Sequence, residues 1–155
     1  MKRVKYLTGT LLGIGRLPAA PGTWASFMFL PAIYFTIWFA GQPGLILLVA
    51  VTSALSVWSA PEAVRRYGED PGEFVMDEAA GQSVAFLMIS FTGMAGTDGM
   101  ILIAGFLLFR LFDILKPLGI DRLQDLSGSF GILADDLLAG VYSCIVLHCI
   151  FFFVS

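Results

Sequence analysis

Long apolar runs separated by short polar segments dominate the chain. No charged residue occurs between Leu17 and Pro61, and this run is about twice the length of the roughly 20-residue helix that crosses a bilayer. The breaker cluster Gly41-Gln42-Pro43-Gly44 falls near its middle. The pattern therefore predicts two membrane-spanning helices, at about 24–40 and 44–60.

The remaining apolar runs predict three more spans. They lie at about 79–96, 100–115 and 135–154, with a short turn at 96–99 and polar loops over roughly 61–76 and 118–131. Pro117 is expected to end the fourth span, because its ring removes a backbone donor and disfavours helix at the residue before it.

The N-terminal segment differs from these spans. Three cations (Lys2, Arg3 and Lys5) precede a short, Gly-rich apolar stretch that lacks a clear signal-peptide cleavage site. We expect an interfacial or half-buried helix there.

Composition supports this interpretation. Of the 155 residues, 57% are hydrophobic and 14% are charged, whereas soluble domains contain about 25% charged residues. The expected fold is all-α, a single domain over 1–155 forming a polytopic membrane bundle of about five helices. No basic patch suggests a nucleic-acid partner, and Cys144 and Cys149 fit neither a disulfide framework nor a zinc site.

The charges are expected on one membrane face. If the N-terminus is cytoplasmic, all nine Lys and Arg residues fall in segments 1–23, 61–78 and 116–134 or at the adjoining helix ends. This is the positive-inside pattern. Among the acids only Asp98 falls on the other side, so the ionisable groups should gather at the cytoplasmic face.

Four polar clusters stand at helix ends on this face. They contain Thr23, Ser26, Asp77, Glu78, Arg110, Asp113, Lys116, Asp135 and Asp136. Each has an ordinary structural interpretation: Thr23 as an N-cap, the paired acids as charges complementing a helix dipole, and Arg110 with Asp113 as an ion pair. Taken together, five carboxylates and two cations at one depth are costly in a membrane and suggest a function.

The side chains fit a magnesium site that acts on phosphate. Mg²⁺ prefers carboxylate and phosphate oxygens, which makes Asp77, Glu78, Asp113, Asp135 and Asp136 the candidate metal ligands. Glu78, Asp113, Asp135 and Asp136 are the candidate catalytic carboxylates. Arg110, Lys116, Thr23 and Ser26 are the candidate phosphate-binding residues, and either water or an Asp carboxylate is the nucleophile.

Other phosphatase chemistries lack their residues. The chain has no Cys-x5-Arg, no Asp-x-Asp-x-Thr and a single histidine, His148, deep in the last span. Cysteine, haloacid-dehalogenase and histidine-nucleophile mechanisms are therefore excluded.

Four ordered motifs resemble the phosphatidylglycerophosphatase A family of bacterial inner-membrane enzymes. They are Pro21-Gly22-Thr23…Ser26, Asp77-Glu78-x2-Gly81, Phe109-Arg110-x2-Asp113-x2-Lys116-Pro117 and Gly131-Ile132-x2-Asp135-Asp136-x2-Ala139-Gly140. The resemblance implies Mg²⁺-dependent hydrolysis of phosphatidylglycerophosphate to phosphatidylglycerol, at the cytoplasmic face of the inner membrane. Ala25 and Gly119 depart from the family pattern without removing a functional group.

Two other functions remain as alternatives. A small ion-coupled transporter also places carboxylates within the membrane, but near the midplane and often at broken helices. A structural scaffold would not need acids beside Arg110. The one-sided charge favours the phosphatase.

Overall fold

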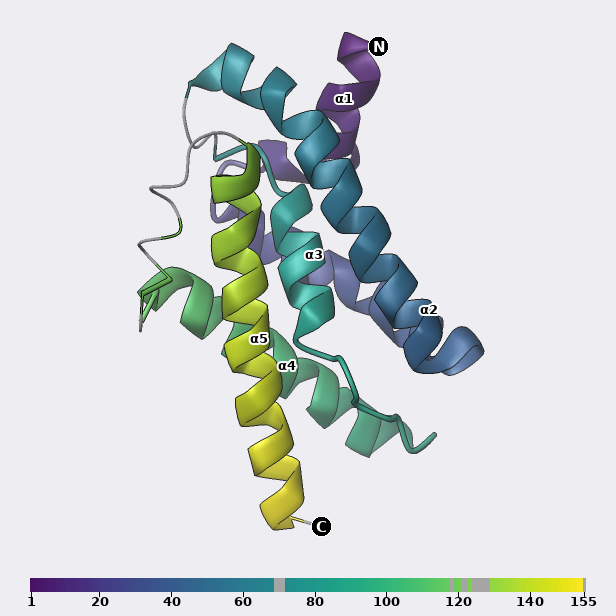
Figure 1. Ribbon diagram of the computed structural model, residues 1–155. Coiled ribbons are helices and arrows are strands. Elements are labelled where there is room, and N and C mark those ends of the chain that lie inside the picture. The colour runs from purple at the N-terminus through teal and green to yellow at the C-terminus, as the bar shows by residue number, and fades with distance from the viewer. Residues whose placement is uncertain (69–71, 118, 121–122, 124–128, 155) are drawn as a thin grey trace.

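The computed structural model describes residues 1–68, 72–117, 119–120, 123 and 129–154, and every regular element in these ranges is a helix (Figure 1). The elements are α1 (Lys2–Gly9), the 3-10 helix η1 (Leu11–Arg16), α2 (Pro21–Tyr67), α3 (Met76–Val84), α4 (Ala95–Leu115) and α5 (Ser129–Val154). The predicted all-α class is confirmed.

The helical surface is strongly apolar. Two helices of the described chain are long and apolar enough to cross a membrane, at Pro21–Arg66 and Phe130–Phe151. Large apolar side chains such as Phe39, Leu47 and Leu107 are 80%, 64% and 59% exposed. Exposed large apolar side chains in such number are typical of a surface that contacts a membrane or another protein. The five-span arrangement itself stays a prediction.

Helix α2 contains the first two predicted spans. Its one non-helical residue is Gly41, at φ 61° and ψ −159°, so the break falls at the start of the predicted turn and the chain reverses there (Figure 1). The loop expected from Pro61 is wrong, because the helix continues to Tyr67. Glu62 supports these last turns, accepting hydrogen bonds from Arg65 Nη2 at 2.6 Å and Arg66 Nε at 3.0 Å.

The predicted helix over 79–96 is also wrong in most of its length. Helix α3 begins at Met76 and ends at Val84, and an irregular segment leads to α4. Gln42, just after the break in α2, supplies this segment with hydrogen bonds. Its Oε1 accepts the N–H of Met88 at 2.8 Å, and its Nε2 donates to the carbonyl oxygen of Ile89. A side chain thereby satisfies backbone groups that a helix would have paired internally.

Asp98 has a structural role at the start of α4. The turn predicted at 96–99 lies inside this helix, which begins at Ala95. The Asp98 carboxylate is buried and accepts hydrogen bonds from the N–H of Thr92 (2.7 Å) and of Gly93 (3.1 Å). The other end of α4 was predicted correctly, since Lys116 takes a left-handed conformation directly before Pro117.

Helix α5 begins at Ser129, earlier than the predicted start at 135. Asp135 and Asp136 therefore lie inside a helix and not at its first turn, which corrects their interpretation as a solvated helix start. Within the predicted loop over 118–131, residues 118, 121–122 and 124–128 lie outside the described residues.

The short helix α3 is the centre of the bundle. It packs against α2, α4 and α5 (Figure 1), and all of its residues except Glu78 are buried. Glycines bring α3 and α5 into backbone contact: a Cβ on Gly81 would lie 2.5 Å from the carbonyl oxygen of Asp136, and one on Gly140 would collide with the carbonyl oxygen of Gly81. Small residues at the crossing allow the two helix backbones to approach this closely.

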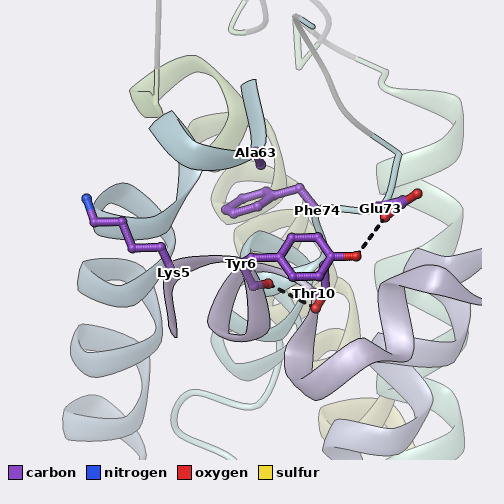
Figure 2. Close-up of a pocket in the computed structure, with 7 residues that line it drawn as sticks. Lys5, Tyr6, Thr10, Ala63, Glu73 and Phe74 are labelled. Atoms are coloured by element: carbon purple, nitrogen blue, oxygen red, sulfur yellow. Dashed lines mark hydrogen bonds between the residues drawn. The ribbon is translucent and has the colours of Figure 1, made fainter. Parts of the chain in front are cut away.

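Helix α1 is half-buried against the C-terminal end of α2. Figure 2 shows the small pocket at this contact, where the Tyr6 hydroxyl donates to Glu73 Oε2 at 3.2 Å beside Phe74. The pocket contains none of the predicted site residues.

Candidate active site

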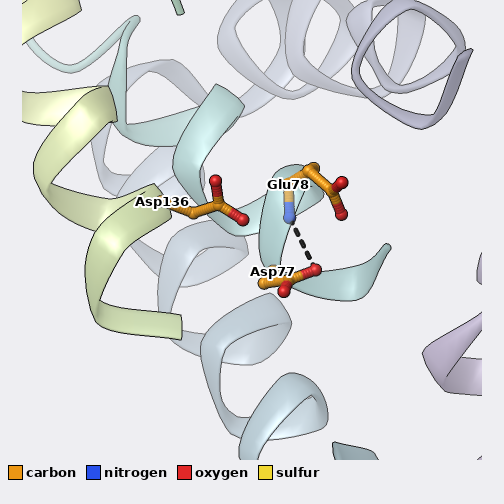
Figure 3. A group of neighbouring side chains, drawn as sticks. All are labelled: Asp77, Glu78 and Asp136. Carbon is orange, nitrogen blue, oxygen red and sulfur yellow. Dashed lines mark hydrogen bonds between the residues drawn. The ribbon is translucent and has the colours of Figure 1, made fainter. Parts of the chain in front are cut away.

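Three carboxylates meet where α3 crosses α5. Asp77 and Glu78 come from the first turn of α3 and Asp136 from α5, and each offers an oxygen within 4.8 Å of the others (Figure 3). Asp77 and Asp136 are only 6% and 4% exposed. The N–H of Glu78 donates to Asp77 Oδ1 at 3.0 Å, and this bond fixes one Asp77 oxygen within the group.

Helix α4 adds a cation and a fourth carboxylate. Arg110 Nη1 lies 2.8 Å from Asp113 Oδ2, one helical turn along. Asp113 also interacts with Asp136, and Arg110 with Glu78. The ion pair of α4 is therefore part of the same charged cluster and not a separate surface feature.

The first turn of α2 closes the cluster on another side. A Cβ on Gly22 would collide with Glu78 Oε1 and lie 3.3 Å from Arg110 Nη1, so a larger residue here would make the Glu78 side chain move away. Ser26 is buried; its hydroxyl donates to the carbonyl oxygen of Gly22 at 2.9 Å and lies 3.5 Å from Arg110 Nη1. Thr23 is not the N-cap that was expected, because the helix begins at Pro21 with Ala20 as its cap.

Lys116 and Asp135 form a second ion pair beside the three carboxylates. Their Nζ and Oδ2 atoms are 2.7 Å apart, and Asp135 Oδ1 accepts the N–H of Asp136. Partial burial opposes the charged form of Lys116, but its hydrogen bond to Asp135 and the charges of nearby acids raise its pKa above the ordinary value. Lys116 is therefore charged at neutral pH.

All four predicted clusters thus meet, although their members are not equivalent. Of the five predicted metal ligands, Asp77, Glu78 and Asp136 form the close group, while Asp113 and Asp135 lie next to it, each paired with a cation. The predicted site residues did not include Gln82, the amide side chain of α3, which lies one turn after Glu78.

Two polar atoms of the cluster have no partner within the described chain. Glu78 Oε2 and Arg110 Nε are both buried and make no hydrogen bond. Buried like charges in contact repel one another unless a cation or proton offsets them. Hard divalent cations bind such oxygens, so the donor set fits Mg²⁺, and the free guanidinium nitrogen fits an anion.

The chain is similar over most of its length to one protein family and to several individual proteins. The family model described as phosphatidylglycerophosphatase A matches residues 7–151. A Bacteroides thetaiotaomicron protein, provisionally named a phosphatidylinositol-3-phosphatase, is 34% identical, with 95% of each chain covered. Proteins named phosphatidylglycerophosphatase A are 30% identical in Haemophilus influenzae (94% of this chain, 87% of the other) and in Escherichia coli (92% and 81%). No solved structure matches significantly.

Proposed function

This chain belongs to the phosphatidylglycerophosphatase A family, and we propose that its carboxylate cluster hydrolyses the terminal phosphomonoester of phosphatidylglycerophosphate with Mg²⁺. The family makes the chain a phosphatidylglycerophosphatase, a phosphoric monoester hydrolase that yields phosphatidylglycerol. The observation that carries the site assignment is the close group of Asp77, Glu78 and Asp136. Arg110 lies beside this group and interacts with Glu78.

Asp77, Glu78 and Asp136 are the residues placed to hold Mg²⁺, with Asp113 and Asp135 in reach of the same group. When bound, the metal would offset their charge, bind phosphate oxygens and lower the pKa of a bound water. The glycine crossing of α3 and α5 fixes the spacing of these side chains before any ligand arrives.

The cations orient and stabilise the substrate phosphate. Arg110 can bind two phosphate oxygens with its planar guanidinium, and its Nε is available for this. Lys116 provides a second positive charge, and the Thr23 hydroxyl at the start of α2 adds a donor near a helix N-terminus, where anions are favoured. The Ser26 hydroxyl can donate to phosphate by giving up its bond to the carbonyl oxygen of Gly22.

Asp113 and Asp136 are the carboxylates assigned to the chemical step. Either one removes a proton from the attacking water, or one attacks phosphorus directly and is released by water in a second step. Both routes leave inorganic phosphate and the lipid alcohol. The close contact of Asp113 with Arg110 orients that carboxylate toward the cluster.

The direct test is phosphate release from phosphatidylglycerophosphate by the purified chain in detergent, with Mg²⁺ and with excess chelator. We expect turnover with Mg²⁺ and a loss of at least about tenfold in chelator, because the phosphate would then meet uncompensated carboxylates. Equal turnover in both conditions would contradict the role of Mg²⁺. Absence of turnover in both conditions would contradict phosphatidylglycerophosphate as the substrate.

A second lipid substrate follows from one comparison. The Bacteroides thetaiotaomicron relative is named for a phosphatase acting on phosphatidylinositol 3-phosphate, which also carries a phosphomonoester on its head group. The same assay with that lipid measures which head group this chain prefers. The relatives described above are named as phosphatases, which supports the hydrolase over a carrier.

We place the cluster at the cytoplasmic face of the bacterial inner membrane, with five segments crossing: the two arms of α2, α3 with the irregular segment that follows it, α4 and α5. The support is the one-sided charge and the exposed apolar side chains of α2, α4 and α5. Two exposed residues test this topology. Gly72 lies shortly before α3, and Met94 lies at the end of the irregular segment that follows α3.

Each position is changed to Cys in a chain whose Cys144 and Cys149 are replaced by Ala. An impermeant thiol reagent should label Gly72→Cys only after the inner face is opened, and Met94→Cys in intact cells. Labelling of Gly72→Cys from outside would place the cluster on the opposite face.

A further inference from the structure

Gln82 is a buried amide without a function in the site described so far. Its side chain is 0% exposed, and neither Oε1 nor Nε2 has a hydrogen-bond partner within the described chain. Leaving buried polar groups unpaired is costly, and nearly all such groups in folded proteins find a partner. The amide therefore calls for a ligand that can both donate and accept.

Gln82 lies on the same side of α3 as Glu78 of the carboxylate cluster. It follows Glu78 by four residues in α3, so the two side chains lie on the same side of the helix, about 6 Å apart along its axis. Glu78 directs Oε1 toward Gly22 and Arg110. Gln82 thus lies one turn further from the helix start, toward the apolar segment that follows α3.

We propose that Gln82 determines head-group specificity by binding the secondary hydroxyl of the glycerol that carries the terminal phosphate. This inference rests on the proposed function. With the phosphate at the carboxylate cluster and the acyl chains in the bilayer, the head-group glycerol must lie between them, on the membrane side of Glu78. A hydroxyl donates one hydrogen bond and accepts others, and an amide does the same, so the two groups are complementary.

The test compares phosphatidylglycerophosphate with an analogue in which propane-1,3-diol replaces the head-group glycerol and the secondary hydroxyl is missing. The wild-type protein should prefer the natural substrate by about tenfold or more in kcat/KM, because the analogue leaves the amide unpaired. In Gln82→Met, which keeps the side-chain length, the preference should fall to within about twofold. Ser83→Ala is the matched control, since the Ser83 hydroxyl donates to the carbonyl oxygen of Ala79 within its own helix.

The outcomes separate this inference from the function on which it rests. Wild-type turnover of neither lipid would contradict the proposed function itself. Equal kcat/KM of the wild-type protein on the two lipids would overturn the role of Gln82. A Gln82→Met protein whose kcat/KM falls by the same factor on both lipids would also overturn it, because the effect would then be structural only. If Gln82→Met does not fold, Gln82→Asn, which withdraws the amide by one methylene, is measured against the same criterion.

Discussion

Asp136→Asn is expected to slow phosphate release at least about 10²-fold while the protein keeps its fold, because removing one positioned charge from an active site typically costs this much. Asp136 is the residue through which α5 joins the three-carboxylate group, and it also faces Asp113. Asparagine preserves its shape but removes the negative charge that a metal or a transferred proton needs. Asp113→Asn should lose a similar factor for the same reason.

Initial rates with phosphatidylglycerophosphate and Mg²⁺ measure the loss, and elution as a single species in detergent shows that the fold is retained. Asp98→Asn is the control, since Asp98 is also buried but accepts its hydrogen bonds at the far end of α4. It should keep near-normal turnover. An Asp136→Asn protein with more than about a tenth of wild-type turnover would remove Asp136 from the catalytic group.

Arg110→Lys should lose activity on the order of 10²-fold although the positive charge is retained. A lysine ammonium cannot bind two phosphate oxygens in the planar manner of a guanidinium. The protein should still insert and bind Mg²⁺, because no metal ligand has changed. Lys116→Ala, by contrast, should raise KM more than it lowers kcat, because Lys116 contributes charge beside the cluster through its pair with Asp135.

Exchanging the charges of Arg110 and Asp113 tests whether Arg110 binds the substrate phosphate or only pairs with Asp113. Arg110 lies 2.8 Å from Asp113, so a purely structural pair would be restored by Arg110→Asp combined with Asp113→Arg. If Arg110 binds phosphate, the exchanged protein stays inactive, because neither group then faces its ligand. Recovery of more than about a tenth of wild-type turnover, a barrier within about 1.4 kcal/mol of normal, would contradict the phosphate-binding role.

The fold could be predicted where local sequence controls the backbone. Gly41 and Pro117 were expected to interrupt helices, and both do. The end of α3 at Val84 could not be predicted, because the residues after it are apolar and suit a helix. What stabilises the irregular segment is Gln42, more than 40 positions away in sequence, and such a tertiary partner leaves no periodic signal.

The clustering of the candidate residues was predictable for a different reason. Carboxylates are rare in apolar segments, so Asp77, Glu78 and Asp136 stand out in the amino-acid sequence itself. Their division into a close trio and separately paired neighbours was not predictable, since it depends on helix rotation and on the Lys116–Asp135 contact across two helices. Thr23 was misplaced because α2 begins two residues earlier, at Pro21.

The glycine contact between α3 and α5 also has a consequence for the membrane placement that we propose. Helices adjust to a thicker or thinner bilayer mainly by changing their tilt. The backbones of α3 and α5 touch at Gly81 and Gly140, so a change in the angle between the two helices would occur about that contact. Asp136 and Glu78 lie within a turn of the pivot and move least when the far ends swing. With the cluster placed in the membrane as we propose, we therefore expect the carboxylate geometry to depend little on membrane thickness.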